Sequence, residues 1–314
     1  MSPPQKQPWK KPAASIPDDP DGPMTGGKMC FERNAVNDTQ KNSVLCPHCR
    51  KLVGRDELRC PYCGAARPGA PWKAIVNLGG ASLEYRIIPA LIYVNVGLYL
   101  LSLLLYPPNL NFMNPLTAFS PSSGSLLLLG ASGTIPIDRA GNWWSLVSAG
   151  YLHGSLLHIL FNMIALKQLG TLTIQAYGAR RMIVIYTLTG IAGYAASYLA
   201  GVRFTIGASA AICGLIGALL YYGKSRGGLF GEALFKQVSG WLVGLFLIGL
   251  MPNINNWGHG AGILSGIAVG YIIAYPEKRP DAFLHNVGAA LSIVLTLLVL
   301  LQAVASGLWY RFFG

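Results

Sequence analysis

The chain has 314 residues, of which 52% are hydrophobic and 11% are charged. Soluble globular proteins carry charge on roughly 25% of their residues, so this composition argues against a soluble enzyme and indicates a membrane protein. The formal net charge of +12 follows from an uneven placement of Lys and Arg along the chain. Binding to nucleic acid is therefore not expected.

The N-terminal part of the chain reads as an arm followed by a small cysteine-rich module. Residues 1–43 are mostly Pro, Lys, Asp, Asn and Gly. Apolar residues are too few there to offset the entropy cost of ordering, which predicts a disordered arm. Residues 44–68 form the module, and residues 69–84 form a linker to the apolar part of the chain.

Two Cys-x-x-Cys pairs, ten residues apart, define the module: they are Cys46, Cys49, Cys60 and Cys63. Four thiolates from two tight turns are the usual ligands of a tetrahedral structural zinc, and the module resembles a zinc ribbon. Two disulfides are the alternative, which a reducing cytoplasmic location disfavours. A bound Zn²⁺ would supply most of the folding energy of so small a unit. A protein partner of the module is a further expectation.

Seven apolar stretches follow, each close to the about 20 residues needed to cross a bilayer. Inside lipid a segment must satisfy its own backbone hydrogen bonds, so these stretches are predicted helices. The expected fold class is an all-α polytopic membrane bundle. The predicted spans are residues 87–106, 146–169, 181–201, 205–223, 234–251, 257–275 and 286–309.

Lys and Arg are concentrated in alternate connections between these spans. They precede the first span and recur at Arg180 and Arg181, at Lys224 and Arg226, and at Lys278. Cytoplasmic loops are enriched in these residues, so we predict a cytoplasmic N-terminus and a C-terminus outside. We expect the inner (plasma) membrane of a bacterium.

Polar side chains inside the predicted spans are few, and they mark a site because polarity in lipid is costly. The second span contains His158 and Asn162, four residues apart and hence on one helix face. The fourth contains Ser209 and the sixth begins near His259. With the predicted orientation these groups share one depth, just below the outer surface. His153 is instead expected to be interfacial or structural.

Small residues predict how the fourth and sixth spans approach each other. Gly258, Gly262, Gly266 and Gly270 recur every four residues in the sixth span, a spacing typical of close helix contact. Such contact would bring the Ser209 hydroxyl to the His259 imidazole, the minimum arrangement for nucleophilic acyl chemistry without a cofactor. No carboxylate is evident as a third partner of the serine and the histidine. His158, Asn162 and a backbone N–H near Ser209 are candidate oxyanion donors.

Three motifs together carry a family resemblance: WWSLVSAGYLHGSLLHILFN, then GASA, then NNWGHGAG. Through them residues 85–275 resemble a rhomboid intramembrane serine protease, with residues 276–314 holding a seventh span after the six-span core. The resemblance implies cleavage of transmembrane segments of other proteins, with Ser209 as nucleophile, His259 as general base and acid, and His158 with Asn162 at the oxyanion. The sequence departs from the family at Ala210, where the motif has Gly, and at Cys213, where many members have an aromatic residue.

Two other classes stay open from the sequence. Ala210 and Cys213 motivate a catalytically inactive rhomboid-like protein that binds membrane segments without cleaving them. A transporter or channel is the other class, since intramembrane polar groups also mark ion paths. The absence of Asp and Glu within the spans, and the single depth of the polar groups, disfavour it.

Overall fold

The computed structural model describes residues 43–46, 51–64, 66–67, 71–107, 119–251, 254–276, 278 and 283–313. The chain divides into two compact units, Met1–Lys73 and Ala74–Gly314. Nearly all of the predicted arm, and Cys49 of the module, lie outside the described residues.

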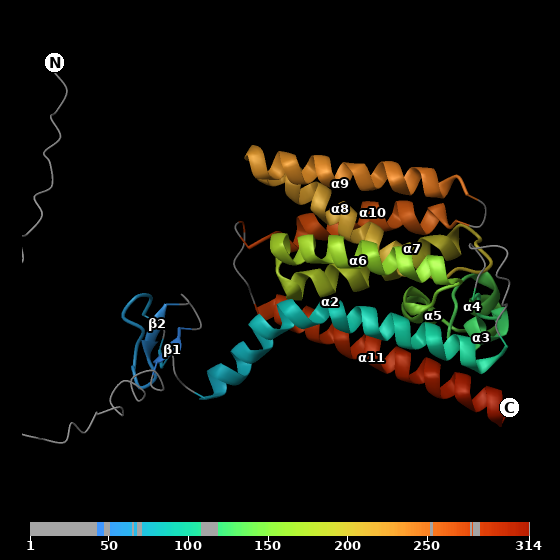
Figure 1. Ribbon diagram of the computed structural model, residues 1–314, viewed down its shortest axis with the longest axis horizontal. Helices are drawn as coiled ribbons and strands as arrows, with labels where there is room; N and C mark the ends of the chain where they lie inside the picture. The colour runs from blue at the N-terminus through green and yellow to red at the C-terminus, as the bar shows by residue number, and fades with distance from the viewer. Residues whose placement is uncertain are drawn as a thin grey trace, which may run out of the picture. The chain divides into compact units, whose positions relative to one another are not determined.

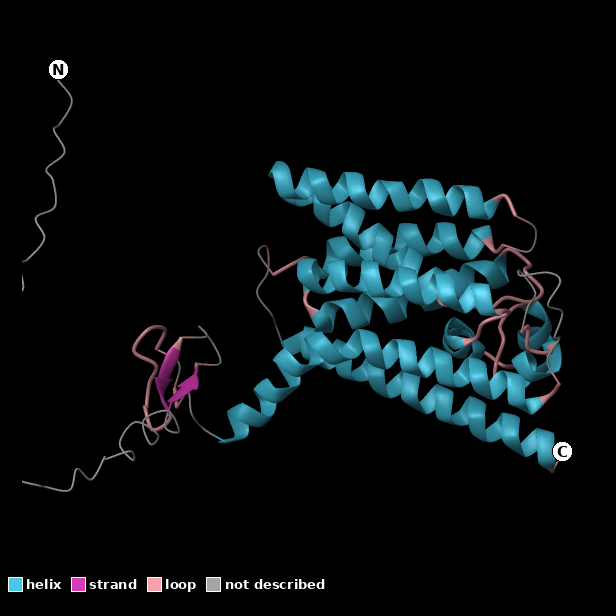
Figure 2. Ribbon diagram, viewed as in Figure 1, coloured by secondary structure: helices cyan, strands magenta, loops and turns pink. Residues whose placement is uncertain are grey.

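The first unit contains a two-stranded antiparallel sheet (Figure 2). Strand β1 (Ser43–Leu45) pairs with β2 (Leu52–Gly54), and Val44 lies opposite Val53. The buried cluster of the described part of this unit consists of Cys46, Val53 and Cys60. So few apolar side chains bury little surface, which makes the cysteine sulfurs a large share of what holds the unit together.

The second unit is a bundle of long helices with short helices gathered at one end (Figure 1). The long helices are α2 (Pro71–Leu105), α6 (Leu156–Tyr177), α7 (Ala179–Leu199), α8 (Ser209–Arg226), α9 (Gly228–Gly249), α10 (Asn256–Ile273) and α11 (Phe283–Phe312). The short ones are α3 (Ser123–Leu128), α4 (Thr134–Ala140), α5 (Ser145–Ser148) and the 3-10 turn η1 (Ala149–Tyr151).

Helix α8 lies in the middle of this unit. It packs against α6, α7, α9 and α10, and Figure 1 shows α9 on one side of the bundle with α2 and α11 on the other. Most residues of α8 between Ala210 and Gly223 are buried. The central position of α8 explains its composition, because Gly and Ala leave room for four neighbouring helices.

Five of the described helices are long and apolar enough to cross a membrane, so the chain is a multi-pass membrane protein. They are Arg86–Leu105, Leu156–Tyr177, Ala179–Leu199, Gly228–Gly249 and Phe283–Phe312. The predicted fourth and sixth spans are the helices α8 and α10, which have 18 residues each and fall outside this set. Glycines lower the mean hydropathy of both helices, together with Lys224 and Arg226 in the last turn of α8 and with Asn256 and His259 in the first turn of α10.

The prediction of one continuous second span over 146–169 is wrong. The structure breaks it into α5, η1 and an extended segment, and α6 begins only at Leu156. The cause is local: Ser155 has an extended backbone, and its side chain accepts a hydrogen bond from the N–H of His158 at 3.3 Å. This is an N-cap, which starts a helix. The break leaves His158 in the first turn of α6.

Candidate active site

Ser209 and His259 lie within hydrogen-bond distance of each other. Ser209 is the first residue of α8 and His259 lies in the first turn of α10. The His259 Nε2 atom is 2.8 Å from the Ser209 Oγ atom, and both side chains are half-buried. A serine paired with an imidazole is the arrangement that activates an alcohol as a nucleophile.

Close backbone contact between α8 and α10 sets this distance. A Cβ atom added at Gly262 would collide with the carbonyl oxygen of Ala210, and one at Gly266 with that of Gly214. From the other helix, a Cβ at Gly217 would collide with the carbonyl oxygen of Ile263. The helices therefore touch where only glycine fits, as the spacing of small residues predicts.

The turn before Ser209 is fixed on both sides of Gly207. Its N–H donates to the carbonyl of Ala149 at 2.9 Å, and its carbonyl accepts from the Tyr194 hydroxyl at 2.7 Å. The backbone φ of Gly207 is 122°, a value that side-chain-bearing residues rarely adopt. Ser209 thus begins α8 at a rigid turn, with the unpaired N–H groups of the helix start beside it.

His158 lies next to this turn. A Cβ atom built on Gly207 would be 2.8 Å from the His158 Nε2 atom and 3.7 Å from the Ser209 Oγ atom, so both border the same point. The Nδ1 atom of His158 accepts from the N–H of Gly154 at 3.3 Å, which assigns the ring proton to Nε2. His158 therefore presents a donor beside the serine.

Asn162 is placed differently. Its Nδ2 atom donates to the carbonyl of His158 at 2.8 Å, one turn back in the same helix. The side chain is buried and shares the helix face of His158, but the described contacts do not bring it to Ser209. Its part in an oxyanion site stays a prediction.

His153 is fully buried within the protein, which favours the structural role over the interfacial one. Neither ring nitrogen has a hydrogen-bond partner within the described residues. The ring lies edge-on to that of His158, with centroids 5.1 Å apart. His153 therefore packs against the ring of His158.

The methyl group of Ala210 points to α7. A Cβ atom built on Gly193 of that helix would lie 2.8 Å from the Ala210 Cβ atom and 2.9 Å from the Gly258 carbonyl oxygen. The glycine at 193 thus makes room for the alanine at 210. Cys213 is buried one turn further on, facing Gly262 of α10. These two departures from the rhomboid motif lie in helix contacts.

The Nδ1 atom of His259 shows whether a third residue orients the imidazole. This atom is buried, and no hydrogen-bond partner for it occurs within the described part of the chain. The described site is thus a pair of residues, with no carboxylate oriented on the imidazole.

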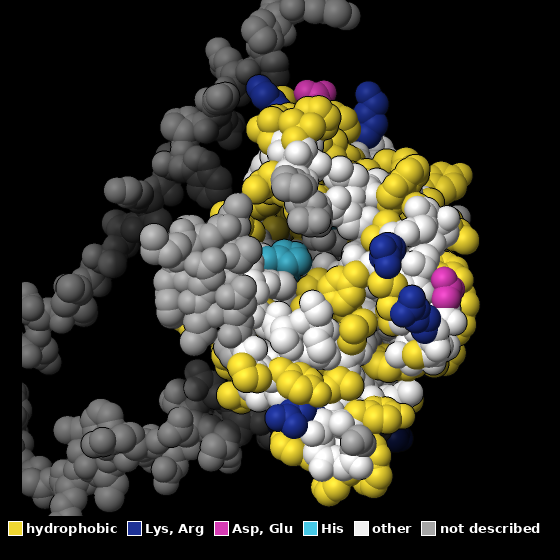
Figure 3. All heavy atoms as spheres, turned by 90° about the vertical axis from the view of Figure 1, so that its right-hand side faces the viewer, with side chains coloured by type: hydrophobic (Ala, Val, Ile, Leu, Met, Phe, Trp, Pro, Cys, Tyr) yellow, Lys and Arg dark blue, Asp and Glu magenta, His cyan; other side chains and the backbone are white. Residues whose placement is uncertain are grey.

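The site is reached from the end of the bundle that carries the short helices. Figure 3 shows this end, where a histidine side chain is visible at the surface. Ser209, His158 and His259 are each partly exposed. Water therefore has access to the serine from this end of the bundle.

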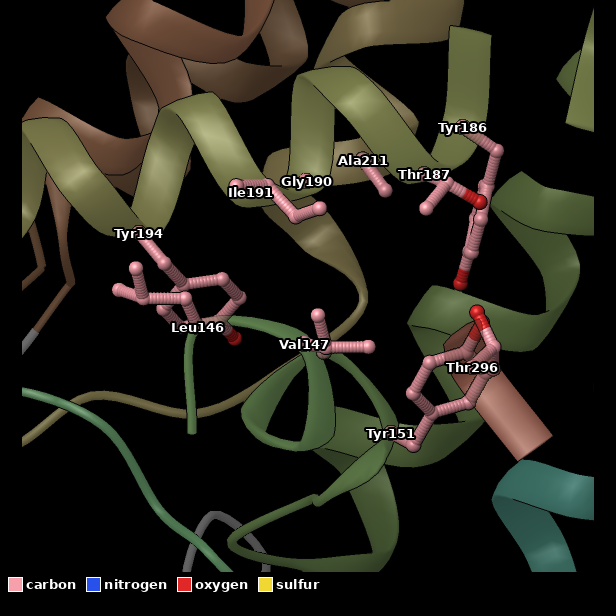
Figure 4. A pocket seen from close by; sticks show the side chains of 11 residues that line it. Leu146, Val147, Tyr151, Tyr186, Thr187, Gly190, Ile191, Tyr194, Ala211 and Thr296 are labelled. Atoms are coloured by element: carbon pink, nitrogen blue, oxygen red, sulfur yellow. The ribbon is translucent and has the colours of Figure 1, made fainter. Parts of the chain in front are cut away.

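A separate small cavity lies between α5, η1, α7 and α11 (Figure 4). Its walls include Tyr151, Tyr186, Tyr194 and Thr296, and its volume is about 20 Å³. That volume suits one water molecule and no substrate. Two of its lining residues are close to the site: Ala211 lies in the first turn of α8, and the hydroxyl of Tyr194 donates to the carbonyl of Gly207.

Three of the four predicted metal ligands lie together in the first unit. The sulfur atoms of Cys46, Cys60 and Cys63 lie within 4.8 Å of one another, and those of Cys46 and Cys63 are 3.6 Å apart. Sulfurs around a tetrahedral Zn²⁺ with bonds of 2.3 Å are separated by about 3.8 Å, whereas a disulfide bond is about 2 Å long. The three thiols therefore fit a metal ion, with a fourth position left for Cys49.

Three residues that were not predicted from the sequence support the site. Tyr194, Gly193 and Asn255 come from positions distant in sequence from the residues they support. Asn255 could have been suspected as a helix N-cap from its place before the sixth span. Nothing in the sequence signals the contacts of Tyr194 and Gly193.

Comparisons with known proteins found relatives of the segment that contains this site. Residues 140–276 match the family model described as the rhomboid domain. Rhomboid protease GluP of Bacillus subtilis is 30% identical over 171 residues, which cover 53% of this chain and 33% of that protein. RHOMBOID-like protein 5 of Arabidopsis thaliana is 31% identical over 163 residues, covering 49% and 51%. Putative rhomboid protease YdcA of Bacillus subtilis is 28% identical over 142 residues, covering 44% and 71%.

The matched segment spans a third to about half of the length of the first two relatives. It contains α6, α7, α8 and α10, and so all the residues around Ser209 described above. Residues 140–276 of this multi-pass membrane protein are therefore similar to the rhomboid domain.

Proposed function

We propose that the chain is an intramembrane serine endopeptidase that cleaves transmembrane segments of other membrane proteins. The observation that carries the proposal is the 2.8 Å approach of His259 Nε2 to Ser209 Oγ, at the start of a buried helix within the segment that matches the rhomboid domain model. The names of two relatives, "Rhomboid protease GluP" and "Putative rhomboid protease YdcA", support the same activity.

The proposed reaction begins with proton transfer from the Ser209 hydroxyl to His259 Nε2. The Oγ atom attacks the carbonyl carbon of the scissile peptide bond and gives a tetrahedral oxyanion. The imidazolium then returns the proton to the leaving nitrogen, the C–N bond breaks, and an acyl-serine ester remains. Water, deprotonated by His259, hydrolyses this ester and releases Ser209.

Stabilisation of the oxyanion falls to donors beside Gly207. The His158 Nε2 atom borders this position, and the N–H groups at the start of α8 are the proposed backbone donors. Removal of one such donor typically costs about 10²–10³ in rate. Asn162 is the further donor that we propose, provided that its amide turns from the His158 carbonyl. No cofactor takes part.

The substrate class follows from where the pair lies. Substrates are proposed to be transmembrane proteins whose segments reach the partly exposed serine from the bilayer. The Lys and Arg distribution supports a cytoplasmic N-terminus and a C-terminus outside. With this orientation the serine would lie near the outer surface. The bacterial inner membrane stays a prediction.

For the first unit we propose a structural zinc site held by Cys46, Cys49, Cys60 and Cys63. The sulfur spacing of the three described cysteines supports it. The ion would hold together a unit whose described apolar core is small. A protein partner of this module is a further proposal.

A reporter assay tests the proposal. Purified protein in liposomes is incubated with a fusion protein that carries one transmembrane segment, and fragments are followed by gel and mass spectrometry. We expect cleavage by the wild type, none by Ser209→Ala, and wild-type rates for Ser265→Ala, whose hydroxyl binds the carbonyl of Gly262 in its own helix. Cleavage that persists in Ser209→Ala would contradict the proposal.

A further inference from the structure

Asn255 joins three segments around the site. It is the N-cap of α10, and its Oδ1 atom accepts from the N–H of Gly258 at 3.0 Å. Its Nδ2 atom donates to Ser197 Oγ at 2.7 Å and to Thr205 Oγ1 at 2.8 Å. Both amide N–H groups and the amide oxygen are therefore used, each on a different segment.

The hydrogen-bond partners of Asn255 lie close to the segments that carry the site. Ser197 belongs to the last turn of α7, and Thr205 lies four residues before Ser209. Asn255 itself lies four residues before His259, and its carbonyl accepts from the His259 N–H at 3.2 Å. The hydrogen bond from Asn255 to Thr205 thus joins the segment that leads to Ser209 to the segment that leads to His259. Each of the two bonded residues lies four positions before the reacting residue of its segment.

Thr205 is itself anchored. Its N–H donates to the carbonyl of Ser132 at 2.8 Å, and its carbonyl accepts from the N–H of Ser132 at 3.1 Å. The side chain is 7% exposed. Because the backbone of Thr205 is held by Ser132 and its hydroxyl by Asn255, the segment leading to Ser209 has little freedom to move relative to α10.

We infer that Asn255 is a positioning residue, which acts through its hydrogen bond to Thr205 to hold Ser209 at the correct distance from His259. This inference rests on the proposed function, since it concerns the same pair. The glycine contacts bring α8 and α10 together along their length, whereas the Asn255–Thr205 bond fixes the ends where the two reacting side chains lie. Errors of about 1 Å in such geometry cost up to about 10² in rate.

The test is the rate at which a fluorophosphonate probe labels the serine of the purified full chain. Thr205→Val removes the acceptor and keeps the shape of the side chain, whereas Thr205→Ser keeps the hydroxyl. We expect about a 10-fold lower maximal labelling rate for Thr205→Val with unchanged apparent probe affinity, and a rate within about twofold of wild type for Thr205→Ser. Ser265→Ala on α10 is the matched control and should label as wild type.

A double-mutant cycle separates positioning from general stability. In an Asn255→Ala background the bond is already lost, so Thr205→Val should cost less than twofold further. Melting curves accompany each variant, and Thr205→Ala serves as the second hydroxyl-free variant if Thr205→Val melts below the assay temperature.

The outcomes distinguish the inference from the proposed function. A wild type that the probe does not label at Ser209 contradicts the proposed function, and the inference falls with it. A labelled wild type with Thr205→Val and Thr205→Ala at full rate overturns the inference alone. The same holds if Thr205→Ser is as slow as Thr205→Val, or if the loss is undiminished in the Asn255→Ala background.

Discussion

The serine site and the cysteine cluster are held together by different means. Around Ser209, glycine contacts between α8 and α10 and hydrogen bonds to Gly207 and Thr205 fix the geometry with protein atoms alone. Around Cys46, Cys60 and Cys63 the described core is a handful of side chains. The first site is therefore expected to exist before any ligand binds, whereas the second depends on its ion.

The largest expected effect is on the first site. Replacing His259 by Ala removes the base, and the rate of reporter cleavage should fall by about 10³-fold or more. The melting temperature should change little, because the imidazole is half-buried and has one described side-chain partner. A variant that retains more than a tenth of the activity would mean that Ser209 is activated by another group.

The second-largest expected effect is the loss of zinc from the first unit without a loss of serine reactivity in the second. In Cys60→Ser, the zinc content measured by mass spectrometry should fall from about one ion per chain to near zero, because the remaining thiolates form an incomplete shell. The first unit should then become sensitive to added trypsin. Probe labelling of Ser209 should stay within about twofold of wild type.

The Cys213→Ser variant is the matched control for this experiment. Cys213 is buried between helices of the second unit, so its loss should leave the zinc content unchanged. Equal zinc content in Cys60→Ser and wild type would refute the metal site.

A third effect concerns the oxyanion. His158→Ala removes the Nε2–H donor beside Gly207, and the cleavage rate should fall by about 10²-fold with a similar KM for the reporter. Asn162→Ala should cost less, since its amide is engaged by the carbonyl of His158. The reverse order would show that the amide, and not the imidazole, holds the oxyanion.

The smallest effect tests the packing that accommodates Ala210. Gly193→Ala places a methyl group against the Ala210 Cβ atom and the Gly258 carbonyl, and overpacking of this kind costs about 1–3 kcal/mol in the free energy of unfolding. Adding Ala210→Gly should recover part of that loss. An additive double variant would show that the two methyl groups do not compete for the same space.

The pairing of Ser209 with His259 could be predicted because it depends on local patterns. Glycines at every fourth position and polar residues within apolar runs are visible in the sequence. Contacts between distant segments are not, and so Tyr194, Gly193 and the bond from Asn255 to Thr205 were beyond prediction. They depend on how α7 and the loop before α8 fold over the start of α10.

Hydropathy predicted the long helices better than their ends. The second span was expected as one helix because its residues are apolar, yet Ser155 caps a new helix and the segment before it folds back as α5 and η1. The short helices α3 and α4 were missed because hydropathy averaged over about 20 residues does not detect helices of six or seven residues.

The most direct test is the site of covalent modification by a fluorophosphonate. Purified wild-type protein is treated with the probe, digested, and mapped by mass spectrometry, with His259→Ala and Ser265→Ala treated in parallel. The account predicts one adduct on Ser209 in the wild type and in Ser265→Ala, and none in His259→Ala. An unmodified Ser209 in the wild type, or equal modification in His259→Ala, would contradict it.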